Sequence, residues 1–184
     1  MRDMKIKLIF GSDTGNTDYV VETYIINLLD PFKVEVKEVH NLKPEDWKTD
    51  DLFILGIPTW YDGDLQSDWE DYYEEFTKID FTGKTVAIFG LGDQIGYSEY
   101  FVDGIGILAK AVLHNGGNII GHWPTEGYDF DESKGLVNED YFYGLAIDED
   151  NESDLTFERI DKWIKQLKSE ISQLTEFAKN LETA

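Results

Sequence analysis

One short loop near the start of the chain, Phe10–Thr17, combines residue types that bind anions. Its sequence, FGSDTGNT, has three hydroxyl side chains and two glycines but no lysine or arginine. The loop follows an apolar run and enters a segment with helical spacing, and free N–H groups at a helix N-terminus favour phosphate. Against the triphosphate motif G-x-x-x-x-G-K-[ST], the interval from Gly11 to Gly15 is one residue short and Asn16 replaces the lysine. The loop therefore predicts a site for one terminal phosphate, with an ordinary capped helix start as the alternative.

Two further glycine-bearing loops each carry an aromatic side chain. Pro58–Asp64 (PTWYDGD) contains Trp60, and Gly90–Tyr97 (GLGDQIGY) ends in Tyr97. At one edge of a sheet the two rings could enclose a planar ligand, and each stacked pair contributes about 1 kcal/mol beyond the area it buries. Taken singly, each ring is better explained as an ordinary core or surface aromatic. The run GLGDQIG differs from a dinucleotide fingerprint because its last glycine comes one residue late.

The elements that must position these loops alternate along the chain. Apolar or alternating runs predict five strands, at residues 5–10, 33–39, 51–57, 85–92 and 118–123. Apolar spacings of three and four predict helices at residues 17–29, 67–79 and 101–113, and a long C-terminal helix at about 155–181. Ser67, with Glu70 three residues later, is the predicted N-terminal cap of the second helix.

This alternation predicts an α/β fold, a doubly wound sheet of five parallel strands with helices on both faces. We expect a single domain over residues 1–184. Residues 124–154 are too long for an ordinary connection and predict an insertion in the last strand region, with a strand of its own at Tyr141–Ile147. Ligands bind beyond the carboxyl ends of such strands, where the strand order reverses, so the three loops should converge there.

The charge balance restricts the possible partners. Sixteen Lys and Arg against 38 Asp and Glu give a net charge of −22, which disfavours nucleic acid and anionic membranes and favours basic proteins. Solubility alone is the competing explanation. The chain has no Cys, which excludes disulfides and cysteine-ligated iron–sulfur clusters, and its scattered histidines predict no metal site. No signal peptide and no apolar run of roughly 20 residues is present, which predicts a cytoplasmic protein.

Together the three loops resemble those of the flavodoxin family, in its long-chain form, which carries FMN. The resemblance covers about Lys5–Leu167, nearly the whole chain. Flavodoxins are themselves the standard example of FMN bound at the switch point of this fold. The matching motifs are S-x-T-G-x-T at Ser12–Thr17, PTW continuing into LQSDWE at Pro58–Glu70, GDQIGY at Gly92–Tyr97, and EGYDF at Glu126–Phe130 inside the insertion.

The resemblance implies a role in FMN binding for each loop. The hydroxyls and amides of the first loop would bind the phosphate without a cationic side chain. Trp60 and Tyr97 would cover the two faces of the ring, while Asp93 and the backbone around Gly92 would bond its pyrimidine edge. The full set of implied cofactor-binding residues is Ser12, Asp13, Thr14, Gly15, Asn16, Thr17, Pro58, Thr59, Trp60, Tyr61, Asp62, Gly63, Leu91, Gly92, Asp93, Tyr97 and Asp150.

Further implied contacts involve the ribityl chain and the N5 atom of the flavin. Thr59 and Asp150 would meet the ribityl chain, and the peptide between Tyr61 and Asp62 would lie where flavodoxins bond N5. The sequence departs from the family at three places. Tyr61 replaces the common Asn, Leu91 replaces the common Thr, and the C-terminal helix runs about a dozen residues past the usual end, from Ile171 to Ala184. The first two departures affect the expected potentials rather than the expected cofactor, and the third is a segment that the resemblance does not explain.

The resemblance implies a low-potential one-electron carrier rather than an enzyme. FMN would shuttle between semiquinone and hydroquinone, and the net charge of −22 would make the second step strongly negative. We expect a monomer whose partners are basic-surfaced redox proteins. The donor would be of the ferredoxin/flavodoxin reductase type or the photosystem type, and the acceptor would be an oxidoreductase.

Three other functions occur on the same fold or site. An FMN-dependent quinone or NAD(P)H reductase needs an open pocket over the flavin, which Tyr97 would cap. A phospho-acceptor domain needs paired acids after the first strand and an Asp ending the third, whereas this chain has Ser12-Asp13 and Gly56–Trp60 there. A binding module that has lost flavin would not need the aromatic pair, which is intact here.

Overall fold

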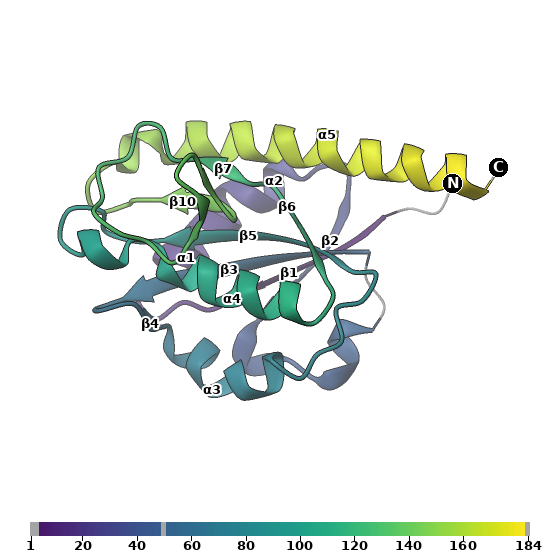
Figure 1. Cartoon of the computed structure of the whole chain (residues 1–184), viewed down its shortest axis with the longest axis horizontal. Coiled ribbons are helices and arrows are strands. Elements are labelled where there is room, and N and C mark those ends of the chain that lie inside the picture. Colours follow the sequence, from purple (N-terminus) through teal and green to yellow (C-terminus); the bar gives the residue numbers. More distant parts are fainter. Residues whose placement is uncertain (1–3, 49–50, 183–184) are drawn as a thin grey trace.

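A parallel sheet forms the centre of the protein. The computed structural model describes residues 4–48 and 51–182, so residues 1–3, 49–50 and 183–184 of the predicted single domain lie outside it. The strands follow the order β10-β5-β3-β1-β2 and pair in parallel, which confirms the predicted doubly wound architecture (Figure 1). They are β1 (Lys5–Phe10), β2 (Lys33–Glu38), β3 (Leu52–Trp60), β5 (Thr85–Leu91) and β10 (Leu145–Ile147).

Two short strands share the fifth position of this sheet. β6 (Asn118–Ile120) pairs with the first half of β5, and β10 pairs with its second half. The chain between them forms a separate antiparallel sheet in the order β7-β9-β8. Its strands are β7 (Trp123–Pro124), β8 (Leu136–Asn138) and β9 (Tyr141–Phe142).

This arrangement differs from two boundaries expected from the sequence. The run Tyr141–Ile147, predicted as one strand, is divided between β9 and β10, which belong to different sheets. The range 124–154, predicted as the insertion, therefore contains β10, which pairs with the main sheet, and the stretch outside that sheet is 121–144. The apolar run carries no signal of this division because both halves contain fully buried residues.

Helices cover both faces of the sheet (Figure 1). One face carries α5 (Thr156–Glu182) and a first helical segment made of α1 (Asn16–Val20), a π-helical turn at Val21–Ile25 and α2 (Ile26–Leu28). The last turns of α5 extend past the sheet (Figure 1). The opposite face carries α3 (Ser67–Phe76) and α4 (Asp103–His114). The remaining short elements are Val39–Asn41, Pro44–Trp47, β4 (Asp64–Leu65), Ser98–Tyr100 and Ser153–Leu155.

The N-terminus of α3 is capped by Gln66, and the prediction of Ser67 as the cap was wrong. The Gln66 side chain accepts from the Trp69 backbone N–H at 3.3 Å. The Ser67 hydroxyl instead donates to Asp13 Oδ1 at 2.6 Å. Trp69 is fully buried, and its indole N–H donates to the Gly56 carbonyl at 2.9 Å. These bonds fix the start of α3 against the middle of β3 and against the loop that follows β1.

A largely buried ion network ties β1 to the segment that precedes β3. Lys7 is 3% exposed, and its Nζ lies 3.2 Å from Asp46 Oδ1. Lys37 Nζ lies 2.5 Å from the same oxygen, and the Lys43 backbone N–H donates to Oδ2 at 2.8 Å. Burial opposes ionisation of Asp46, but these donors outweigh it and lower the pKa of its carboxyl to about 2.

We expect Asp46 to stabilise the fold at neutral pH but not in strong acid. Because its pKa is depressed, the contribution is complete above the ordinary value of 3.8 and is lost as the pH falls through about 2. This shift corresponds to about 2 kcal/mol. In urea unfolding, Asp46→Asn should lose at least about that free energy of unfolding at neutral pH, and the difference from wild type should shrink towards pH ~2. A difference that does not vary with pH would contradict this assignment.

Candidate functional site

One cavity opens at the carboxyl ends of β1, β3, β5 and β10, and its volume is about 470 Å³. Strand topology brings its walls together from four separate parts of the sequence. Gly15, Asp62 and Gly63, also predicted as site residues, lie in the same loops but do not line the cavity. The lining consists of Ser12, Asp13, Thr14, Asn16, Thr17, Pro58, Thr59, Trp60, Tyr61, Leu91, Gly92, Asp93, Tyr97 and Asp150.

The first loop forms the N-terminal end of the first helical segment. Gly15 adopts a φ of 90°, a left-handed conformation that glycine takes without steric cost. Its N–H donates to Ser12 Oγ at 3.1 Å, so this amide is used within the loop and the Ser12 hydroxyl keeps its own proton to donate. Thr17 is buried, and its Oγ1 has no hydrogen-bond partner within the described chain. Buried polar atoms are normally bonded, so this hydroxyl is available to a ligand.

Asp13 joins the first loop to the start of α3. Its carboxylate accepts from Ser67 Oγ at 2.6 Å and from Gln66 Nε2 at 2.9 Å. Burial favours the neutral acid, but the bonds from Ser67 and Gln66 outweigh it and hold the pKa of Asp13 below its ordinary value. Gln66 is fully buried. Sequence reasoning did not identify Gln66, because only folding brings it to Asp13.

The second loop presents an unsatisfied indole and a strained backbone. The Trp60 Nε1–H is buried and has no hydrogen-bond partner in the part of the chain that the structure describes. Tyr61 has a φ of 42°, which is uncommon for a non-glycine residue, and its side chain is 62% exposed. The Thr59 hydroxyl accepts from the Gly104 backbone N–H at 2.9 Å and retains a proton to donate. Backbone strain of this kind clusters at ligand-binding segments.

The third loop is organised by the Asp93 side chain. Its Oδ1 accepts from the backbone N–H groups of Ile95 at 3.0 Å and Gly96 at 2.6 Å, and from Asn151 Nδ2 at 2.8 Å. Burial favours the neutral acid, but these bonds hold the pKa of Asp93 below its ordinary value. The carboxylate expected at a ring edge is thus engaged in holding its own turn, which places Tyr97, 42% exposed, in the cavity wall.

The cavity is acidic and its lining includes no Lys, Arg or His. Burial, and then the charges of Asp93 and Asp148, raise the pKa of Asp150 above its ordinary value. Such a site suits a ligand held by hydroxyls, amides and aromatic rings, and it opposes added negative charge on that ligand. The described residues contain no cluster of His, Cys, Asp and Glu that could hold a metal ion. No helix in residues 4–48 and 51–182 is long and apolar enough to cross a membrane.

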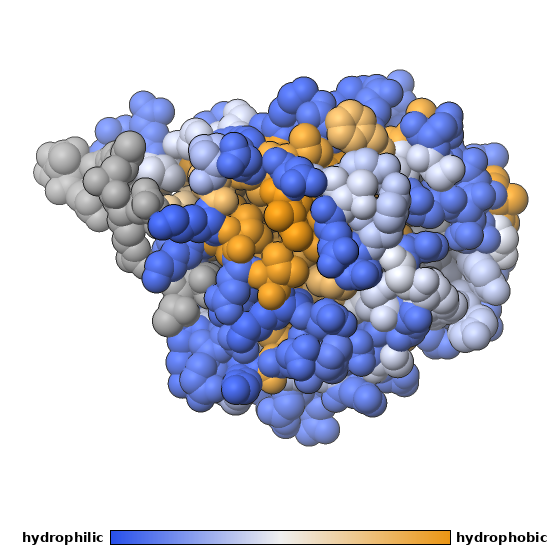
Figure 2. Space-filling view, turned by 180° about the vertical axis from the view of Figure 1, so that it is seen from behind, coloured by the Kyte–Doolittle hydropathy of each residue, from blue (hydrophilic) through white to orange (hydrophobic). Residues whose placement is uncertain are grey.

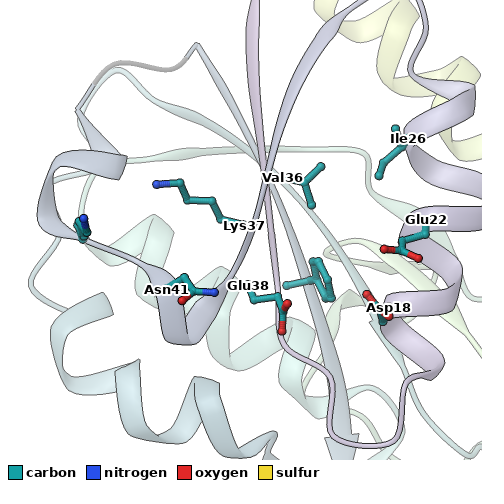
Figure 3. Close-up of a pocket in the computed structure, with 9 residues that line it drawn as sticks. Asp18, Glu22, Ile26, Val36, Lys37, Glu38 and Asn41 are labelled. Carbon is teal, nitrogen blue, oxygen red and sulfur yellow. The ribbon is translucent and has the colours of Figure 1, made fainter.

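A second groove lies between the first helical segment and the edge strand β2 (Figure 3). Carboxylates border its apolar floor at Val36, which is 38% exposed, and Lys37 points away from that floor (Figure 3). Figure 2 shows the apolar side chains that gather on the back face of the molecule. None of the predicted site residues lines this groove. The buried polar atoms that have no hydrogen-bond partner in the described residues also lie outside its lining. We therefore place the functional site in the first cavity. The groove, of about 610 Å³, is lined by Phe10, Asp18, Glu22, Ile26, Val36, Lys37, Glu38, Asn41 and Lys43.

Comparison with known proteins finds relatives that match most of the chain. The family model described as Flavodoxin matches residues 8–163. A flavodoxin from Klebsiella pneumoniae is 46% identical over 166 residues, which cover 90% of this chain and 94% of that protein. A flavodoxin from Nostoc sp. is 48% identical over 169 residues, covering 90% and 96%. Among solved structures, a Fusobacterium nucleatum flavodoxin bound to flavin mononucleotide has a TM-score of 0.85 and 33% identity, covering 90% of this chain and 98% of its own.

Proposed function

Because this chain belongs to the flavodoxin family, we propose that it carries single electrons between redox proteins on a non-covalently bound FMN. The cavity supports this most directly, since the hydroxyl-bearing first loop, at the start of a helical segment, and two aromatic side chains meet there. Two buried atoms in its lining without partners in the described chain, Thr17 Oγ1 and Trp60 Nε1, fit a ligand that carries acceptor atoms. When bound, FMN supplies the redox chemistry, while the protein supplies binding and electrostatics.

The lining residues divide into groups that suit the parts of FMN. The hydroxyls of the first loop, at a helix N-terminus, would hold the phosphate. Trp60 and Tyr97 would pack on the two faces of the ring, with the backbone around Gly92 at its pyrimidine edge. Thr59 and Asp150 would meet the ribityl chain. The absence of a cation from the lining suits a single phosphate held by neutral donors.

We expect Thr17→Val to weaken FMN binding by about tenfold or more, because a hydrogen bond to a charged phosphate is worth roughly 1.5–3 kcal/mol. Valine keeps the shape of the side chain and removes a buried hydroxyl that has no partner in the described chain, so the apoprotein should not lose stability. Fluorescence titration measures the affinity. Riboflavin, which lacks the phosphate, is the control ligand. An equal loss of affinity for FMN and for riboflavin would contradict a phosphate-binding role for Thr17.

The second electron should enter the bound flavin only at a strongly negative potential. The net charge of −22 and the carboxylates in the cavity lining oppose added negative charge on the ligand. Potentiometry of the FMN-loaded protein should resolve two one-electron steps, the second lying below that of free FMN. A second step at or above that of free FMN would contradict this proposal. Rapid NAD(P)H oxidation by the isolated protein would favour an FMN-dependent quinone or NAD(P)H reductase instead.

We further propose that the protein is a cytoplasmic monomer and that its redox partners present basic surfaces. The net charge of −22 supports electrostatic steering of such partners to the cavity rim. A basic c-type cytochrome serves as the probe acceptor. The second-order rate constant for its reduction by the reduced protein should fall by at least about tenfold between roughly 0.01 M and 1 M salt. Over this range the Debye length shortens from about 30 Å to about 3 Å, which screens the attraction between the two proteins. A rate that does not change with salt would contradict a charge-guided encounter.

A further inference from the structure

Gln94 is a buried polar residue of the third loop that does not line the cavity. Its side-chain amide donates to Asp148 Oδ2 at 2.8 Å and to Glu152 Oε2 at 2.9 Å. Its backbone N–H also donates to Asp148 Oδ2, at 3.2 Å. Its side-chain oxygen accepts from the Asp129 backbone N–H at 2.6 Å. One side chain therefore bonds the third loop both to the loop after β10 and to the inserted segment.

Asp148 and Asn151 carry these contacts on to the cavity wall. Asp148 is fully buried and accepts from the backbone N–H groups of Asp150 at 3.1 Å and Asn151 at 3.0 Å. Asn151 Nδ2 donates to Asp148 Oδ2 at 2.9 Å and to Asp93 Oδ1 at 2.8 Å. Asp93 and Asp150 both line the cavity. Through Asp148, the contacts of Gln94 thus reach two residues of the lining: the backbone of Asp150 directly, and the Asp93 carboxylate by way of Asn151.

The inserted segment is anchored to the same network from its other side. Arg159 of α5 pairs with Glu152 at 2.7 Å, and its guanidinium carbon lies 4.2 Å from the centroid of the Tyr128 ring. The Tyr128 hydroxyl donates to the Ala146 carbonyl of β10 at 2.6 Å. Tyr128 directly precedes Asp129, whose N–H bonds Gln94. The contacts of Tyr128 with α5 and with β10 therefore hold this part of the insertion in place.

From these contacts we propose that Gln94 is a positioning residue for the third flavin-binding loop, and that the inserted segment acts on the flavin site through it. The inference rests on the proposed function and adds the residue that transmits the effect of the insertion. A neutral amide suits this position because it donates to two carboxylates and accepts from a backbone N–H at the same time. Loss of the amide removes a donor from the buried Asp148 carboxylate and from Glu152, and the third loop loses its bond to Asp129 of the insertion. The bonds between Ser98 and the insertion, at Asp131 and Glu132, remain.

Two substitutions separate this positioning role from simple packing. Gln94→Met keeps the approximate volume and removes all the side-chain hydrogen bonds. Gln94→Glu keeps the volume and the oxygen that accepts from the Asp129 N–H, but it places a carboxylate against those of Asp148 and Glu152. Protonation of the new carboxyl restores one of the two lost donors. The defect of Gln94→Glu should therefore diminish on acidification. The charged and titratable groups in and around this position are Asp93, Tyr128, Asp129, Asp148, Asp150, Glu152 and Arg159.

The test is a fluorescence titration with FMN, with circular dichroism and urea unfolding of each apoprotein. Gln166→Met is the matched control, because Gln166 donates to the His122 carbonyl at 2.9 Å and to Glu170 at 2.7 Å but does not line the cavity. We expect Gln94→Met to raise the FMN dissociation constant about tenfold or more and Gln166→Met to change it less than about twofold. We expect the Gln94→Glu defect, as a ratio to wild type at the same pH, to shrink from pH ~8 to pH ~5.

The outcomes distinguish this inference from the proposed function. Gln94 variants that bind FMN as wild type does, at every pH, would overturn the inference and leave the proposed function intact. A wild-type protein that binds no FMN would overturn both. If Gln94→Met does not fold, the pH profile of Gln94→Glu decides: a constant ratio to wild type overturns the inference, and a ratio that falls on acidification supports it.

Discussion

Replacing Trp60 with alanine is expected to raise the dissociation constant for FMN by about 10- to 100-fold, because stacking of an aromatic side chain on a nucleotide-like ring is worth roughly 1–3 kcal/mol. Trp60 lines the cavity and is only partly buried, so part of its surface remains for a ligand. Its indole N–H is buried without a partner in the described chain, so the substitution also removes a donor that a bound ligand would satisfy. Fluorescence titration of the apoprotein with FMN measures the change.

Trp60→Phe is the matched variant for this prediction. Phenylalanine keeps an aromatic face but lacks the N–H, so its loss of affinity should be smaller than that of alanine. Urea unfolding of both apoproteins checks that neither substitution disturbs the fold. A Trp60→Ala protein that binds FMN within about twofold of wild type would show that this ring does not contact the flavin.

Gly144→Ala is expected to lower the free energy of unfolding by about 3 kcal/mol or more, because overpacking a closed interior typically costs 1–3 kcal/mol and backbone contacts relax least. Gly144 directly precedes β10, and a Cβ there would overlap the Ile88 carbonyl of β5. That overlap can be relieved only by moving β10 away from β5, where Leu145 pairs with Phe89. Urea unfolding of the apoprotein measures the loss.

Gly127→Ala is the control that separates steric overlap from backbone strain. Gly127 has a φ of 88°, and a Cβ there would meet no heavy atom within 4 Å. Its substitution should cost only the left-handed backbone penalty, roughly 1–2 kcal/mol. If Gly144→Ala costs no more than Gly127→Ala, β10 is not packed against β5 as closely as the structure shows.

Local sequence pattern is sufficient to predict the main helices and strands of the fold. Within the predicted strand Asp51–Ile57, every residue after Asp51 is apolar, because β3 lies in the middle of the sheet with helices on both faces. This pattern predicts a buried strand. The convergence of the three loops followed from the same topology, since the carboxyl ends of parallel strands share one edge. Trp60 and Tyr97, singled out as aromatics in those loops, both line the cavity.

The features that the sequence did not predict depend on contacts between distant segments. Ser67 and Glu70 have the spacing of a helix cap, but the Ser67 hydroxyl donates its hydrogen bond to Asp13, which is 54 residues away in the sequence. Nothing in the sequence near Gln94 indicates that its side chain bonds Asp148, because only the fold brings these two residues together. The division of Tyr141–Ile147 between two sheets depends on which neighbour each half meets, and an apolar run does not encode that choice.

Visible spectroscopy of the purified apoprotein during titration with FMN tests the central claim most directly. We expect saturable binding of one FMN per chain, with shifted flavin absorption bands and strong quenching of flavin fluorescence by the aromatic pair. Stepwise reduction of this complex should then proceed through two distinguishable one-electron stages. A spectrum that remains the sum of free FMN and protein at every ratio would contradict the assignment of this chain as an FMN-based electron carrier.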